Sequence, residues 1–256
     1  METKNDVQLE NAAEFYAQKD DVFGRIADRY DLLCDLFSLG IHRLWKQRVA
    51  EVIAREPWSQ LLDCATGTGD IVLRILKQKV LRQHQTIIAS DLSSQMLARA
   101  QKRLQDHRHH VEFRVLDAHS ISAVASESVD LYSISLGLKI CERSQVLSEA
   151  WRVLRPGGRL VILEASNIPW FWLHQIYLIY MRVSMPVIGW FATGGDTSAY
   201  RYLLKGIEGF PTAERLAEEL TSLGFEDIVF ERLSLGIVAI HVARKPVVRE
   251  LGKTAA

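Results

Sequence analysis

The chain has 256 residues, and its 31 Lys and Arg balance its 31 Asp and Glu to a formal net charge of zero. This length fits one α/β domain with additional helices. The balanced charge offers no general attraction for nucleic acid or another polyanion, so no nucleic-acid partner is expected. The cysteines, Cys34, Cys64 and Cys141, lie far apart and form no CxxC pair, which predicts a reducing cytoplasm and no metal site.

The N-terminal region, residues 1–56, is predicted to form a helical cap. Residues 21–56 place apolar side chains at helical spacing, and Gly40 is expected to separate two helices. The polar, acidic start shows no basic leader followed by an apolar run, so no secretory signal is expected.

Residues 57–167 alternate two kinds of sequence pattern and are predicted to form a cofactor-binding core. The strand-like runs are 61–65, 86–91, 111–118, 129–137 and 159–166, and the helix-like runs between them are 70–78, 93–105 and 143–154. Strands that alternate with helices predict a Rossmann-like α/β fold, in which helices cover both faces of a parallel sheet.

The most apolar and aromatic stretch lies within residues 168–210, which are predicted to form a helical lid or substrate insertion. As a membrane span it fails, because His174, Gln175 and Arg182 are costly in hydrocarbon and Pro186 interrupts the run. A helix that covers an apolar pocket or rests on a membrane face is favoured. The side chains that would contact a tail or an interface are Trp170, Phe171, Trp172, Tyr177, Tyr180 and Trp190.

Residues 211–248 depart from the alternation and are expected to complete the sheet. An amphipathic helix at 212–225 precedes strand-like runs at 227–235 and 237–245. Gly236 joins these runs so tightly that they must be antiparallel. The prediction is therefore a mainly parallel seven-stranded sheet with an antiparallel C-terminal hairpin, followed by a frayed tail at 249–256.

The stretch "LLDCATGTGD" (61–70) contains a glycine turn between the first predicted strand and helix. Gly67 and Gly69 let a ligand approach the free N–H groups at the helix start, although many turns use glycine for backbone conformation alone. Val72 stands where the dinucleotide fingerprint has its third glycine, so a pyrophosphate ligand is disfavoured.

Acidic residues end the next two predicted strands. Asp91 comes at the interval at which a second-strand carboxylate accepts hydrogen bonds from ribose hydroxyls. Asp117 and Ala118 follow the third strand, where a side-chain acceptor and a backbone group can read an adenine edge. Each acid could instead cap the following helix.

Together, "LLDCATGTGD", "ASDLSSQML", "LDAHS", "SISLGL" and "RVLRPGGRLVILE" resemble a class I S-adenosylmethionine-dependent methyltransferase. The segments "FGRIADRYDLLCDLFSLGIHRLWK" (23–46), "AYRYLLKGIEGFP" (199–211) and "LSLGIVAIHVARK" (233–245) resemble the ubiquinone/menaquinone C-methyltransferase family. The resemblance implies S-adenosylmethionine as cofactor and implies a shaping and capping role in the turn for Asp63 and Asp70. The cofactor-binding positions that it implies are Asp63, Gly67, Thr68, Gly69, Asp91, Leu92, Met96, Asp117, Ala118 and Ser135.

The acceptor side departs from the family pattern. In "LGLKI", Lys139 stands where arginine is usual and Ile140 where asparagine is usual. In "EASNIPW", Ala165 and Asn167 replace bulkier or charged residues. Lysine lacks the planar fork of arginine, and isoleucine lacks the donors and the acceptor of asparagine. The cofactor half therefore follows the family and the acceptor half is altered.

The resemblance implies methylation of a hydroquinone-type ring carbon. Such a reaction needs side chains that polarise a ring hydroxyl. The catalytic candidates are Lys139, Tyr202, Arg201 and Tyr30, with Tyr200 and Asp31 as further candidates. Lys139 comes first, because an ammonium stabilises a developing phenolate and a desolvated lysine can act as a base. The alternative is a solvated surface lysine. A second group, His42, Arg43, Trp45 and Lys46, forms either a lid over the cofactor or the basic end of an amphipathic helix.

The implied partner is a small, lipophilic, prenylated aromatic substrate of the demethylmenaquinol or demethoxy-ubiquinol type. A peripheral contact with the inner membrane face and a homodimer are both compatible with the sequence, and core packing is the alternative use of the aromatic run. Two other functions stay open. One is methylation of another aromatic or heteroaromatic carbon, nitrogen or oxygen in secondary metabolism. The other is a cofactor-binding protein or cyclase on the same scaffold that transfers no methyl group.

Overall fold

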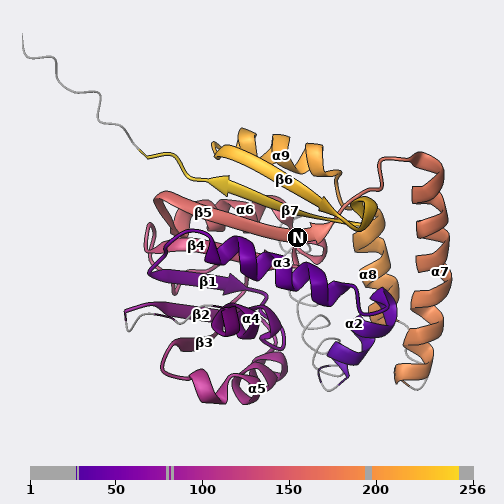
Figure 1. Ribbon diagram of the computed structural model, residues 1–256, viewed down its shortest axis with the longest axis horizontal. Coiled ribbons are helices and arrows are strands. Elements are labelled where there is room, and N and C mark those ends of the chain that lie inside the picture. The colour runs from indigo at the N-terminus through magenta and orange to yellow at the C-terminus, as the bar shows by residue number, and fades with distance from the viewer. Residues whose placement is uncertain (1–26, 28, 79–80, 82–83, 194–197, 248–256) are drawn as a thin grey trace, which may run out of the picture.

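A seven-stranded sheet forms the centre of the computed structural model, which describes residues 27, 29–78, 81, 84–193 and 198–247, without the side chains of 191–202 (Figure 1). The strand order is β3-β2-β1-β4-β5-β7-β6. The strands are β1 (Gln60–Cys64), β2 (Thr86–Asp91), β3 (Val111–Val115), β4 (Val129–Ser135), β5 (Leu154–Ala165), β6 (Glu226–Leu233) and β7 (Val238–Arg244). Strand β7 runs antiparallel to both of its neighbours, so the predicted antiparallel C-terminal pair is confirmed.

Helices cover both faces of this sheet, as the alternating pattern predicts. They are α3 (His42–Ala54), α4 (Asp70–Gln78), α5 (Ser94–Arg103), α6 (Arg143–Val153) and α9 (Ala213–Ser222). Adjacent side chains of a strand point to opposite faces. Leu61 accordingly packs in the core beneath α3 and α4, whereas Leu62 packs in the core beneath α6 and α9. In Figure 1, α3 crosses in front of the sheet and α6 lies behind it.

Three further helices, α2 (Tyr30–Ser38), α7 (Phe171–Thr193) and α8 (Ser198–Glu208), gather beyond the carboxyl ends of the parallel strands (Figure 1). A small core of Leu33, Met181 and Met185 holds α2 against α7. Gly40 separates α2 from α3 with a positive φ of 77°, as predicted. Helix α7 forms the right-hand edge of the molecule in this view.

The structure corrects two predicted boundaries. Pro186 does not interrupt the aromatic run, because α7 continues through it as one helix of 23 residues. Proline removes one backbone donor, but packing of the apolar face outweighs that loss. Strand β5 begins at Leu154, five residues before the predicted start, because Leu154 pairs with Val129. Within the described residues, no helix has both the length and the hydropathy that crossing a membrane requires.

Candidate active site

A cavity of about 400 Å³ lies at the carboxyl ends of the parallel strands and extends beneath α2, α7 and α8. Most of the predicted cofactor-binding residues line it, namely Gly67, Asp91, Leu92, Met96, Asp117, Ala118 and Ser135. Two catalytic candidates, Tyr30 and Lys139, line it as well. The side chains of Tyr200, Arg201 and Tyr202 lie outside the described residues, although these residues are part of α8.

The glycine turn is held from below by Asp63. Its carboxylate accepts hydrogen bonds from Thr66 Oγ1 and Ser133 Oγ, each at 2.6 Å, so Asp63 shapes the turn and does not line the cavity. Burial raises the pKa of Asp63 to about 6. Gly67 has a φ of 56°, and a Cβ there would meet nothing within 4 Å, so the space above it is open to a ligand. Gly69 serves packing instead, because its Cβ would lie 3.1 Å from Ala100 Cβ.

Thr68 occupies the far side of the same turn. Its hydroxyl donates to Asp31 Oδ1 at 2.9 Å and accepts from Arg103 Nη1 at 2.8 Å. Arg103 also pairs with Asp31. Thr68 therefore ties α2 to the glycine turn and to α5 from outside the main cavity. A resemblance of sequence placed Thr68 at the cofactor, but the structure directs its hydroxyl to this external cluster.

The strand-end acids Asp91 and Asp117 are both fixed by neighbouring N–H groups. Asp91 Oδ2 accepts from Gly67 N at 2.8 Å, and Oδ1 accepts from Ser93 N at 2.9 Å. Asp117 Oδ1 lies 2.6 Å from His119 Nδ1 and accepts from His119 N at 2.9 Å. These bonds fix the two carboxylates at one edge of the sheet, where the sequence predicted a ribose and an adenine contact.

The chemistry of this edge fits an adenosine-bearing ligand. Leu92, Met96 and Ala118 line the cavity with apolar surface against which a purine could pack, and the Asp91 carboxylate could accept from vicinal hydroxyls. Ser135 Oγ is buried, and among the described residues it has no hydrogen-bond partner. A buried hydroxyl without a partner costs free energy, so a ligand polar group at Ser135 would stabilise the site.

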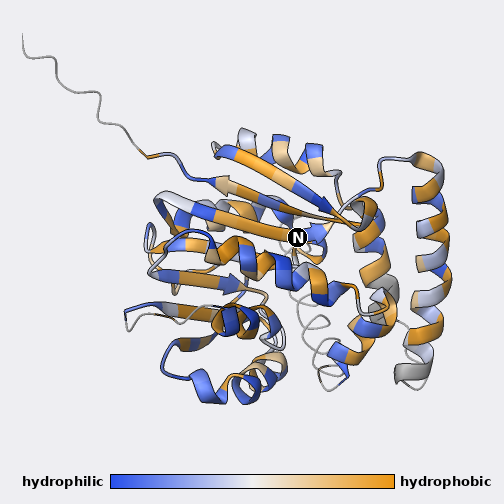
Figure 2. Ribbon diagram, in the orientation of Figure 1, coloured by the Kyte–Doolittle hydropathy of each residue, from blue (hydrophilic) through white to orange (hydrophobic). Residues whose placement is uncertain are grey.

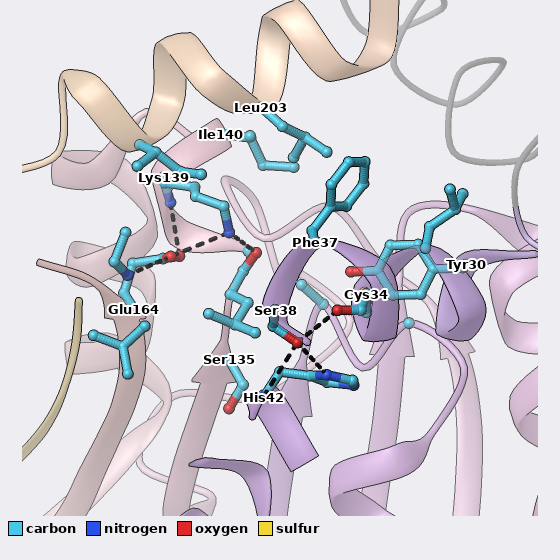
Figure 3. A pocket seen from close by; sticks show the side chains of 18 of the residues that line it. Tyr30, Cys34, Phe37, Ser38, His42, Ser135, Lys139, Ile140, Glu164 and Leu203 are labelled. Carbon is cyan, nitrogen blue, oxygen red and sulfur yellow. Dashed lines mark hydrogen bonds and ion pairs between the residues drawn. The ribbon is translucent and has the colours of Figure 1, made fainter. Parts of the chain in front are cut away.

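Lys139 lies at the junction between this edge and the rest of the cavity (Figure 3). Its Nζ is 3.1 Å from Glu164 Oε1 and also donates to the Leu136 carbonyl. The exposed fractions of the two side chains are 8% and 1%, so the alternative of a solvated surface lysine is wrong. An ammonium has three N–H donors, and in the described part of the chain no acceptor contacts the third.

A second polar group on the cavity wall, Ser38 with His42, was not predicted as a pair (Figure 3). Ser38 Oγ lies 2.8 Å from His42 Nδ1 and donates to the Cys34 carbonyl at 2.6 Å. Burial, assisted by the positive charge of Lys46, lowers the pKa of His42 to about 4. Nearby, the Cys34 sulfur and burial raise the pKa of Tyr30, so its phenol remains a donor.

The "HRLWK" segment contributes three buried side chains, His42, Trp45 and Lys46, and two exposed ones, Arg43 and Leu44. Lys46 Nζ pairs with Asp70 Oδ2 at 3.1 Å at the start of α4. Trp45 Nε1 donates to Ser234 Oγ at 2.8 Å, which fixes α3 to the loop before β7. Arg43 is exposed and pairs with Asp35. His42 and Trp45 line the cavity, whereas Arg43 is exposed to solvent, so a lid over the cofactor stays a prediction for His42 and Trp45.

The end of the cavity farthest from the glycine turn is apolar. Leu33, Phe37, Met181, Met185, Leu203 and Ile207 line it. Ile140 points toward Leu203 in Figure 3. A Cβ at Gly206 would lie 2.8 Å from the Lys139 carbonyl and 3.5 Å from Ile140 Cγ2, so α8 packs directly on this segment. Ile140 therefore suits its surroundings, in which an asparagine amide would need buried partners.

Replacing Asp63 by asparagine is expected to change how stability depends on pH. Because burial raises the folded-state pKa from 3.8 to about 6, Asp63 binds its proton more tightly in the folded state. Its ionisation therefore lowers stability as pH rises through this window, by about 2 to 3 kcal/mol at neutral pH. Urea unfolding at pH values below and above the window measures this, and the stability of Asp63→Asn relative to wild type should rise with pH. A constant difference would contradict the assignment.

Comparisons with known proteins agree with this geometry. The model of the ubiE/COQ5 methyltransferase family matches residues 11–245. The ubiquinone/menaquinone biosynthesis C-methyltransferase UbiE of Ruegeria sp. (strain TM1040) is 38% identical over 225 residues, covering 86% of this chain and 87% of the relative. The enzyme of the same name from Rickettsia felis is 36% identical, covering 88% of this chain and 91% of the relative.

Solved structures share the fold at lower identity. The CurJ carbon methyltransferase superposes with a TM-score of 0.59 at 21% identity, over 78% of this chain and 54% of that one. Phosphoethanolamine N-methyltransferase 2 of Haemonchus contortus, in complex with S-adenosylhomocysteine, superposes with a TM-score of 0.57 at 16% identity. The match covers 79% of this chain and 52% of that one. With the family match, the strand-end carboxylates and the open glycine turn, the chain belongs to the ubiE/COQ5 methyltransferase family and is an S-adenosylmethionine-dependent methyltransferase.

Proposed function

We propose that the protein methylates a ring carbon of a hydroquinone that carries an apolar tail. The cavity carries this proposal. The strand-end carboxylates line one end of it, apolar side chains line the other end, here called the apolar chamber, and the buried Lys139–Glu164 pair lies between the two. A polar ring placed at the junction can reach Lys139 while its tail extends between α2, α7 and α8. The relatives named for ubiquinone and menaquinone biosynthesis support this class of acceptor.

Gly67, Asp91, Asp117 and Ser135 would hold the cofactor, with the purine between the apolar walls. The bound cofactor supplies a methyl group on a positively charged sulfur. We propose that Lys139 places the ring, because its third N–H can donate to a ring oxygen and stabilise negative charge there. The ion pair with Glu164 fixes the position of Nζ, so we propose that Lys139 acts as a hydrogen-bond donor to the ring.

The residue range 168–210, which contains α7 and α8, acts in this proposal as a lid that keeps water from the ring. Exclusion of water strengthens the hydrogen bond from Lys139 and aligns the acceptor for displacement. Tyr30 is a second proposed donor, because its phenol lines the cavity and its pKa is raised. Arg201 and Tyr202, on α8, remain proposed contacts to the acceptor.

Mass spectrometry tests the proposed reaction directly. Purified protein would be incubated with S-adenosylmethionine and a chemically reduced demethylnaphthoquinol with a short prenyl tail. The expected product carries one additional ring methyl group, with an equal amount of S-adenosylhomocysteine. If cofactor binds but this quinol is not methylated, the acceptor is another aromatic or heteroaromatic ring, as the replacement of asparagine by Ile140 would allow. If no acceptor yields S-adenosylhomocysteine, methyl transfer itself is rejected.

We further propose that the protein works in the cytoplasm and contacts the membrane through the outward face of α7. Six exposed apolar side chains recur along this face at helical spacing: Trp172, Ile176, Ile179, Val183, Val187 and Trp190. Figure 2 shows α7 in orange and pale colours along most of its length. Tyr180 and Leu39 are exposed and also line the cavity, so its rim is apolar where a tail would enter. Aromatic side chains with one polar end favour the membrane interface.

Polar substitutions in the middle of this face are expected to abolish binding to lipid vesicles. In the triple variant Ile176→Gln, Ile179→Gln and Val183→Gln, sedimentation with vesicles should fall to background, because three of the six exposed apolar side chains of this face become polar. Turnover of a water-soluble acceptor without a tail should stay near wild type. Sedimentation equal to wild type contradicts the membrane contact, and conversion of a wild-type dimer to a monomer would assign this face to a second copy.

A further inference from the structure

The proposed reaction requires an acceptor for the ring hydroxyl proton, and few groups on the cavity wall can serve. Asp91 and Asp117 accept hydrogen bonds from N–H groups next to them in the fold. Glu164 accepts from Lys139 N at 3.0 Å, from Ala165 N at 2.8 Å and from Lys139 Nζ. Burial raises the pKa of Cys34, so its thiol keeps its proton at neutral pH. His119 also lines the cavity, but its hydrogen bond to Asp117 raises its pKa to about 9, so it already holds a proton at neutral pH. Among the described residues of the cavity wall, His42 is the remaining imidazole.

The hydrogen bonds of His42 determine which ring nitrogen carries its proton. Ser38 has one hydroxyl hydrogen, and the 2.6 Å contact directs it to the Cys34 carbonyl. Ser38 Oγ must therefore accept, and it does so from His42 N at 3.3 Å and from His42 Nδ1 at 2.8 Å. Asp35 Oδ1, a second acceptor, lies 3.7 Å from Nδ1. The proton lies on Nδ1, and the lone pair lies on Nε2.

Several charged groups surround this imidazole and set its response to a proton. Arg43 and Lys46 lie on the same helix, Asp35 lies on α2, and Asp70 lies at the start of α4. Burial, and after it the charges of Lys46 and Arg43, lower the pKa of the imidazole to about 4, so it is uncharged at neutral pH. Asp35, behind Nδ1, stabilises an imidazolium once it forms, as the carboxylate of an acid–histidine pair does.

From this arrangement we infer that His42 Nε2 accepts the hydroxyl proton of the ring acceptor, while Ser38 and Asp35 position the imidazole. This inference rests on the proposed function. As the O–H bond breaks, its electron pair enters the ring, and the ring carbon forms its bond to the methyl group. The sulfur–methyl bond breaks, and its electron pair stays on sulfur. The ring hydrogen at the methylated carbon then leaves as a proton to water, which restores the aromatic ring. The quinol oxygen is reprotonated by the imidazolium.

A matched set of variants separates proton transfer from positioning. His42→Asn keeps an amide N–H near the Nδ1 position and removes the Nε2 lone pair. Ser38→Ala keeps Nε2 but removes the partner of Nδ1. Wild-type turnover should be nearly constant between about pH 6 and about pH 8, because the free imidazole is uncharged throughout this range. His42→Asn should turn over about 100-fold more slowly at neutral pH. Its rate should rise about tenfold per pH unit as hydroxide ionises the acceptor in place of His42.

Two measurements distinguish this inference from a structural role and from failure of the proposed function. Calorimetry should give the same S-adenosylhomocysteine affinity for wild type and His42→Asn. A second measurement uses the absorbance of 4-nitro-1-naphthol bound together with S-adenosylhomocysteine. The naphthol should ionise at a lower pH when bound to the wild-type protein than when bound to His42→Asn. Unchanged turnover and an unchanged naphthol titration in His42→Asn would overturn the inference, and so would loss of product affinity. If wild type methylates no quinol but the naphthol shift is present, only the proposed acceptor is rejected.

Discussion

Asp91→Asn is expected to weaken binding of S-adenosylmethionine and of S-adenosylhomocysteine by about 10- to 150-fold in calorimetry. The carboxylate is fixed at the end of β2 by Gly67 N and Ser93 N, so it meets a ribose already oriented. An asparagine presents one oxygen and one amide nitrogen in the same volume. The oxygen cannot satisfy two ribose hydroxyls and Gly67 N at once, and the nitrogen faces another donor.

The control for this variant is a carboxylate on the neighbouring strand. Glu112 on β3 is exposed and pairs with Arg114, 2.7 Å away, outside the cavity. Glu112→Gln should leave cofactor affinity within about twofold of wild type, because an exposed pair contributes little. Equal affinities of Asp91→Asn and wild type would show that the ribose lies elsewhere.

Lys139→Met is expected to lower the free energy of unfolding by about 3 to 5 kcal/mol and to abolish turnover. The substitution leaves Glu164, whose side chain is 1% exposed, as a buried charge without its ammonium partner. Turnover is lost separately, because methionine has no donor for the ring oxygen. Lys139→Arg should retain both stability and a measurable rate, since a guanidinium keeps the charge and the donors.

The double variant Lys139→Met, Glu164→Gln separates these two effects. Glutamine keeps an oxygen for the backbone N–H groups of Lys139 and Ala165 but carries no charge. Urea unfolding should therefore show the double variant to be more stable than Lys139→Met alone, whereas its turnover stays lost. If Lys139→Met unfolds within 1 kcal/mol of wild type, the buried pair contributes less than its geometry indicates.

The strands and most helices could be predicted from the sequence because their patterns are local. Asp91 and Ser135 end β2 and β4, so the sequence placed them at the correct edge of the sheet. The error at Pro186 has a physical reason. A proline rule describes one lost hydrogen bond, but α7 is held by side chains of α2, which no local pattern in α7 records.

The cavity could be predicted less completely, because its polar groups meet across long separations. Lys139 and Glu164 are 25 residues apart and come from different elements. The Ser38–His42 bond spans the break between α2 and α3, so helical periodicity gives no reason to pair them. A signal was present, since the two residues lie four positions apart on either side of Gly40. Thr68 is the opposite case. It lies inside the glycine motif, but its hydroxyl bonds to Asp31 and Arg103 on the side of the turn away from the cavity.

The close contact between Gly206 and the Lys139 carbonyl has a consequence for redesign of the acceptor range. Leu203 and Ile207 flank this contact on α8 and face the apolar chamber, so exchanging them resizes the chamber without lifting the helix. Any side chain at position 206 would meet the Lys139 carbonyl and push α8 away from the segment that contains Lys139. A library of variants that changes the chamber should therefore keep glycine at position 206, because this glycine fixes the distance between α8 and the Lys139 segment.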